Sequence, residues 1–131
     1  WAGRGGHGPQ GGGVAPEDLL DGHATARAVD GTGRQRLGEL GPFETRTTKS
    51  QIAFRRRRGF AYLWLPGQYL RGPHADVVLS IALDRHDASS RFKEVVQPTP
   101  GRWMHHLELG DPDDVDAEVV RWLEEAARDA D

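Results

Sequence analysis

Four consecutive arginines, Arg55 to Arg58, are the most distinctive chemical feature of this sequence. The guanidinium group is a planar, permanently charged fork that binds phosphate and carboxylate groups through paired hydrogen bonds. Glu44 is the single acidic residue between positions 43 and 58, so the stretch is strongly basic. We therefore expect a site for nucleic acid or another polyanion here. Its candidate residues are Arg46, Lys49, Arg55, Arg56, Arg57 and Arg58.

A second interpretation of the arginine run is structural. The net charge of −3 hides a segregation of charge, because ten acidic residues and two arginines occupy positions 108–131. The arginines could pair with the carboxylates of Asp113, Asp114, Asp116 and Glu118, or they could protect a sheet edge from aggregation. Both interpretations of the run remain open from the sequence.

Histidines supply an alternative ligand site. His74 and His105, with Asp76, Asp84 and Asp87, suggest a small-molecule-binding or hydrolytic enzyme domain with a His/Asp site between sheet and helix. His105 and His106 point to opposite faces of a regular strand, so the two cannot ligate one metal. The sequence contains no GxSxG, HExxH, Walker or Rossmann pattern. An enzyme is therefore the less favoured class, and we expect no catalytic residue, metal or cofactor.

Aromatic residues could extend the basic site. Phe60, Tyr62 and Trp64 alternate along one predicted strand, so they share a face. Such a row can stack unpaired bases beside arginines, or it can belong to the core. A third function, a protein–protein interaction module, also remains open.

The composition places limits on the class of protein. A chain of 131 residues accommodates one domain. It contains no cysteine, which excludes disulfides and cysteine-ligated zinc. We see no signal peptide and no membrane span, and we expect a cytoplasmic protein. Residues 1–15 are predicted to form a flexible glycine-rich tail, and residues 16–131 a single α+β domain.

Alternating apolar residues predict the strands. The predicted strands are residues 43–48, 51–56, 60–65, 77–83 and 102–109, with the turn Arg57-Arg58-Gly59 between the second and the third. Gly59 is expected to supply a positive φ angle in the turn between the second and third of these segments. Residues 92–96 suggest a helical turn or an irregular edge, and Pro98 and Pro100 argue against regular structure there.

Two helices are predicted at the ends of the domain. One lies between Pro16 and Leu40, where several glycines are expected to interrupt it. The other starts at Asp111 and Pro112, and an apolar stripe through Val119 and Trp122 is expected to face the sheet. The predicted fold is α+β: an antiparallel sheet of about four or five strands packed against an N-terminal and a C-terminal helix in two layers.

Three short patterns in the sequence resemble those of a known family. The S-x-I-x-F-x-R pattern at Ser50 to Arg56, the Phe60-Ala61 strand and the aspartate-rich start of the last helix are similar to an uncharacterised bacterial family, the domain of unknown function numbered 5655. This resemblance covers about residues 41–127 and implies no assigned activity. A weaker similarity of pattern, in the last strand and helix, is to the frataxin-like α+β proteins.

Overall fold

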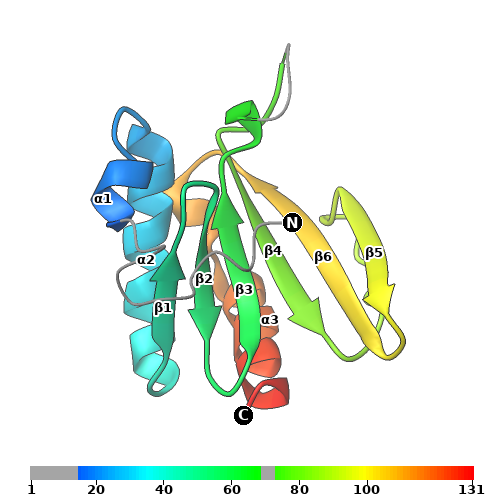
Figure 1. Cartoon of the computed structure of the whole chain (residues 1–131). Helices are drawn as coiled ribbons and strands as arrows, with labels where there is room; N and C mark the ends of the chain where they lie inside the picture. Colours follow the sequence, from blue (N-terminus) through cyan, green and yellow to red (C-terminus); the bar gives the residue numbers. More distant parts are fainter. Residues whose placement is uncertain (1–14, 69–72) are drawn as a thin grey trace.

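The computed structural model describes residues 15–68 and 73–131, which form one antiparallel sheet with two long helices on one face (Figure 1). The predicted two-layer α+β architecture is confirmed, but the sheet has six strands rather than four or five. The predicted flexible tail, residues 1–15, lies outside the described residues except for Ala15.

The order of strands in the sheet differs from their order along the chain. The spatial order is β1-β2-β3-β4-β6-β5, and each neighbouring pair is antiparallel. β6 therefore lies between β4 and β5, which leaves β5 at the edge. The strands are β1 (Glu44–Thr47), β2 (Gln51–Arg55), β3 (Gly59–Trp64), β4 (Val77–Leu83), β5 (Glu94–Thr99) and β6 (Arg102–Leu109).

The N-terminal helices are α1 (Pro16–Leu19) and α2 (Ala24–Leu40). Contrary to the sequence-based expectation, α2 continues through Gly31, Gly33 and Gly38. These glycines lie in open space, with no atom within 4 Å of where a Cβ would be, so only their intrinsic helix propensity opposes the helix. Burial of Val29 and Leu37 against the core offsets that cost.

The C-terminal helix α3 (Ala117–Asp129) begins later than predicted. Asp111 caps a separate turn, η3 (Pro112–Asp114), and Asp116 caps α3 by accepting a hydrogen bond from the amide of Val119 at 3.1 Å. The face of the helix is as predicted, because Val119 and Trp122 are buried. Among the described residues, no helix has the length and apolar character that a membrane crossing requires.

Strand β5 is the strand that the sequence did not predict. Pro98 lies within it, although proline cannot donate a hydrogen bond to a neighbouring strand. Its edge position explains this, since an edge strand needs backbone partners on one side only. The pairing with β6 also shifts register between Val96 and Thr99, around the proline.

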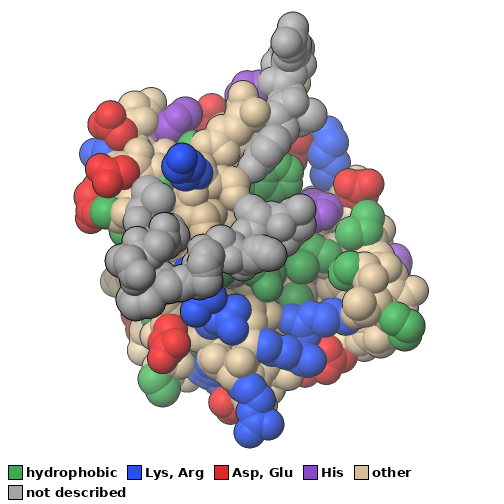
Figure 2. Space-filling model, viewed as in Figure 1, with side chains coloured by type: hydrophobic (Ala, Val, Ile, Leu, Met, Phe, Trp, Pro, Cys, Tyr) green, Lys and Arg blue, Asp and Glu red, His purple; other side chains and the backbone are tan. Residues whose placement is uncertain are grey.

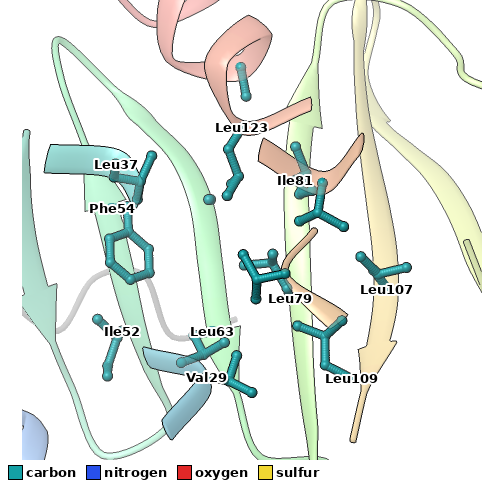
Figure 3. Packing of buried hydrophobic residues seen from close by; sticks show 14 of the residues in the cluster. Val29, Leu37, Ile52, Phe54, Leu63, Leu79, Ile81, Leu107, Leu109 and Leu123 are labelled. Carbon is teal, nitrogen blue, oxygen red and sulfur yellow. The ribbon is translucent and has the colours of Figure 1, made fainter. Parts of the chain in front are cut away.

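The core fills the space between the helices and one face of the sheet. Leu37 of α2 and Leu123 of α3 approach Phe54 of β2, Leu63 of β3 and Leu79 of β4 (Figure 3). A one-residue register shift between β2 and β3 adds Phe60 to this core. Phe60 is fully buried, so the predicted aromatic row is reduced to Tyr62 and Trp64, both only half-buried.

The loop from β4 to β5 fastens α3 to the sheet. Trp122 Nε1 donates a hydrogen bond of 3.1 Å to the carboxylate of Asp87, and the Trp122 ring lies 4.4 Å from that of Phe92. Arg85 donates two hydrogen bonds, of 2.7 and 2.9 Å, to Glu125. The position of α3 therefore depends on this loop.

We expect Trp122→Ala to lower the free energy of unfolding by about 3–5 kcal/mol, because the packing of a large buried ring is removed. Trp122→Phe should cost less, since it keeps most of the ring and removes the hydrogen bond to Asp87. Denaturant unfolding followed by circular dichroism measures both. An unchanged midpoint for Trp122→Ala would contradict the assigned packing of α3.

The Arg85–Glu125 pair predicts a pH dependence of stability. Its hydrogen bonds lower the pKa of Glu125 below the ordinary value. A pKa that is lower in the folded state adds stability above roughly pH 4.3, and this stability is lost as the pH falls through the folded-state pKa. Glu125→Gln should therefore flatten the acid limb of the unfolding free energy measured between neutral and acidic pH. Glu39→Gln, at an exposed position of α2, is the control; equal acid limbs in both variants would argue against the pair.

Candidate functional site

The arginine run forms the turn between β2 and β3. Figure 1 shows this turn beside the C-terminal end of α3. The amide of Arg57 donates a 2.9 Å hydrogen bond to the carbonyl of Ala130, and Arg58 Nη2 donates one of 2.9 Å to the carbonyl of Asp129. The positive turn thus lies against the negative end of the helix dipole.

Two of the four arginine side chains are engaged within the protein. Arg56 Nε donates to the carbonyl of Pro42 at 3.1 Å, and its Nη1 lies 3.6 Å from the carboxylate of Asp131. Arg58 forms a 3.2 Å ion pair with Asp84. Both side chains therefore contribute to holding the turn in place.

Three of the four carboxylates predicted to neutralise the run have other partners. Asp116 and Glu118 pair with Arg91 at 3.0 and 2.9 Å, and Asp114 accepts hydrogen bonds from the amides of Gly110 and Asp111. The amide of Asp113 is held by the Asp111 cap. Among the residues described, none of these four carboxylates pairs with an arginine of the turn, whose ion pairs are with Asp84 and Asp131.

The remaining basic candidates differ from Arg56 and Arg58 in their contacts. Within residues 15–68 and 73–131, the side chains of Arg46, Lys49, Arg55 and Arg57 make no hydrogen bond or ion pair. Arg46 pairs in register with Ala53, so it lies on the same face as Arg55, one diagonal away. Lys49 belongs to the β1–β2 turn, at the opposite end of β2 and roughly 20 Å from Arg55 by strand length. Arg46 is thus a neighbour of Arg55, and Arg55 and Arg57 line the same hollow, whereas Lys49 lies apart from them.

An open hollow of about 490 Å³ lies at the arginine turn. Arg55, Arg56 and Arg57 line it together with the carboxylates of Glu44 and Asp131. The other lining residues are Leu40, Pro42 and Phe43. Arginines outnumber carboxylates here, so the hollow can accept an anion while its charge stays partly balanced.

Arg102 joins these cations from β6, and the sequence analysis did not identify it. Its Nη2 donates a 2.6 Å hydrogen bond to the carbonyl of Gly59, and its Nη1 is buried without a hydrogen-bond acceptor, 3.6 Å from Asp84. Burial, followed by the nearby guanidinium of Arg58, lowers the pKa of Arg102. Figure 2 shows basic side chains gathered on the lower part of the sheet face that the helices leave open.

Gly59 has a different role from the one predicted. Its φ angle is not positive, and it is the first residue of β3. A Cβ at this position would lie 2.9 Å from the Tyr62 ring, so glycine is required for the tyrosine to lie over the backbone. Tyr62 is thereby held on the helix-free face, near Arg102.

The histidines of the alternative ligand site do not lie together in the structure. His105 is fully buried, with Nε2 accepting from the amide of Asp87 at 3.0 Å and Nδ1 at 3.2 Å from the carbonyl of Ile81. Burial lowers the pKa of His105, so the neutral imidazole is a structural group with both nitrogens used. His74 is exposed in the loop before β4, whereas His105 pairs with Ile81 in the middle of that strand. The two histidines are not brought together.

A series of hydrogen-bonded polar side chains on the helix-free face was also not predicted from the sequence. Trp64 Nε1 donates to Ser80 Oγ at 2.8 Å, and Ser80 Oγ lies 2.6 Å from His106 Nδ1. Alternation places each residue on this face, but the sequence does not reveal that β4 pairs with β6 and skips β5. In the described part of the chain, no group of three or more His, Cys, Asp or Glu residues could hold a metal ion.

Comparisons with known proteins give one relationship. No curated protein and no solved structure matches this chain, so the weaker similarity to the frataxin-like proteins stays a prediction. The domain of unknown function DUF5655 matches residues 17–129, which include every helix except the first residue of α1 and every strand of the sheet. The chain belongs to the DUF5655 family, as its central hairpin and the start of its last helix predicted.

Proposed function

We propose that this domain binds single-stranded nucleic acid on the helix-free face of its sheet. The phosphate-binding residues are Arg46, Arg55 and Arg57, at the end of the sheet where β2 turns into β3. The observation that carries the proposal is that these three side chains have no partner in the described part of the protein, although two neighbouring arginines in the same turn do.

The chemistry of the surface suits a phosphate chain. Each guanidinium offers several N–H donors in one plane, and phosphate oxygens accept them in pairs. Arg56 and Arg58 add to the positive electrostatic potential of this surface, although their hydrogen-bond donors are partly used within the protein. Because the whole chain carries a net charge of −3, attraction over long distances is weak, and binding depends on local contacts.

The aromatic residues favour a single strand over a duplex. Tyr62 and Trp64 lie on the same face as Arg46 and Arg55, and both residues are half-buried. Unpaired bases stack on such rings, whereas the bases of a duplex are stacked on one another and inaccessible. A sheet face with basic residues at one end and aromatic residues along it is a suitable platform for an extended strand.

The other two function classes have less support. The histidines of the enzyme alternative lie apart, and His105 is buried with both ring nitrogens occupied. A protein-interaction module would be expected to expose apolar side chains. Among the described residues, Val96 is the one large hydrophobic side chain classed as exposed.

The double variant Arg55→Gln/Arg57→Gln should weaken binding to a labelled oligothymidylate, measured by fluorescence anisotropy at low salt. The dependence of log affinity on log salt should become shallower by roughly 0.7 for each phosphate that the variant no longer neutralises. The melting temperature should stay close to that of the unchanged protein, because neither side chain bonds to the described part of the fold.

Arg27→Gln/Arg36→Gln is the matched control. Both arginines are exposed on α2, on the other side of the sheet, so the same charge is removed far from the proposed surface. This variant should bind as the unchanged protein does. Equally weakened binding in the two double variants would show that only net charge matters, and no saturable binding by the unchanged protein below roughly 100 μM would refute the proposal.

A further inference from the structure

The hydrogen-bonded chain from Trp64 to His106 favours one neutral tautomer of the histidine. An indole N–H can only donate, so Ser80 Oγ accepts from Trp64. Ser80 is fully buried, and its own hydrogen has His106 Nδ1 as an acceptor 2.6 Å away. This assignment leaves His106 Nδ1 unprotonated and places the ring hydrogen on Nε2. Burial lowers the pKa of His106 and favours the same neutral form.

His106 borders a hollow of about 290 Å³ on the helix-free face. Trp64, Pro66 and Val78 provide its apolar lining. Its polar groups are His106, Glu94, and the Lys93–Glu108 ion pair, whose charged atoms are 3.4 Å apart. A hollow of this size is at the lower end of the range for small-molecule sites, which suits one planar ring system rather than a large ligand.

Glu94 and His106 form an acceptor–donor pair at this hollow. They are directly opposite each other in the β5–β6 ladder, so their side chains are nearest neighbours on one face. Within the described residues, the side chain of Glu94 makes no hydrogen bond or ion pair, and its carboxylate offers two acceptor oxygens. The hollow therefore presents a bidentate acceptor next to an imidazole N–H donor.

We propose that this hollow binds a guanine base of the bound strand. The Watson–Crick edge of guanine carries two adjacent donors, N1–H and the N2 amino group, which match the two oxygens of the Glu94 carboxylate. The next atom along that edge, O6, is an acceptor that the His106 Nε2–H or the Lys93 ammonium can meet. The apolar lining contacts the ring faces.

The same arrangement discriminates against the other bases. Uracil and thymine have one donor flanked by two carbonyl oxygens, which a carboxylate repels. Adenine and cytosine each offer a single amino group on that edge, so they cannot satisfy both carboxylate oxygens through two different ring positions. A well-formed bidentate contact to a base is worth a discrimination of roughly tenfold or more.

This inference rests on the proposed single-strand binding, and its test separates the two. The affinities of an oligothymidylate and of the same strand with one central guanine are compared by fluorescence anisotropy. The guanine-containing strand should bind roughly tenfold more tightly. Glu94→Gln should abolish that preference while affinity for the oligothymidylate is kept or slightly increased, because a negative charge is removed. Glu39→Gln, the exposed α2 control, should leave the preference intact.

A second measurement needs no phosphate chain. Guanosine 5′-monophosphate is titrated into ¹⁵N-labelled protein, and the Trp64 indole and His106 imidazole resonances are followed. Both should shift and saturate with the guanine nucleotide, and shift much less with the uridine nucleotide. Glu94→Gln should remove the difference between the two nucleotides.

The possible results separate the two proposals. Equal affinity for the two strands, or a guanine preference that persists in Glu94→Gln, overturns the guanine site and leaves phosphate binding by the arginines standing. If neither strand binds but the guanine nucleotide shifts both resonances, the hollow is supported and the proposed strand binding fails. If neither the strands nor the nucleotide produces a response, both proposals fail.

Discussion

The contact between the β2–β3 turn and the end of α3 is the constraint on which the site depends. The last carbonyl groups of a helix have no partner within the helix. Here Arg57 supplies a backbone amide to Ala130, and Arg58 supplies its guanidinium to Asp129. The two donors fix the turn against the helix, and the helix is itself fixed by Trp122 and the β4–β5 loop. The packing of α3 on the sheet therefore determines the position of the arginine turn.

The two faces of the sheet differ in polarity. The helix side is apolar, and even His105 there is neutral and fully hydrogen-bonded, because an unpaired charge would be costly in the core. On the opposite side, alternation places polar groups in the central strands. Ser80 is buried there without penalty, because Trp64 and His106 satisfy its hydroxyl. That buried hydrogen-bonded chain orients the imidazole that borders the proposed base site.

The elements predicted correctly from the sequence are those set by local patterns, such as β4 and the buried face of α3. The wrong predictions arise where tertiary structure outweighs local preference. The three glycines of α2 are tolerated because the helix packs on the core, and Pro98 is tolerated because β5 is an edge strand. The separation of Lys49 from Arg55 follows from strand length once the turns are placed. The pairing of β4 with β6, which brings Ser80 beside His106, is a long-range property that no local pattern encodes.

The arginines at the turn also create an electrostatic reason to bind an anion. Arg58 and Arg102 share the carboxylate of Asp84, at 3.2 and 3.6 Å, and Asp129 supplies a further negative charge near Arg102. Their proximity helps to lower the pKa of Arg102, after the larger effect of burial. Arg46, Arg55 and Arg57 add further positive charge without carboxylate partners among the described residues. A phosphate group bound at the turn would reduce this mutual repulsion in addition to its own hydrogen bonds, so the same crowding of charge that costs the isolated domain stability would favour the bound state.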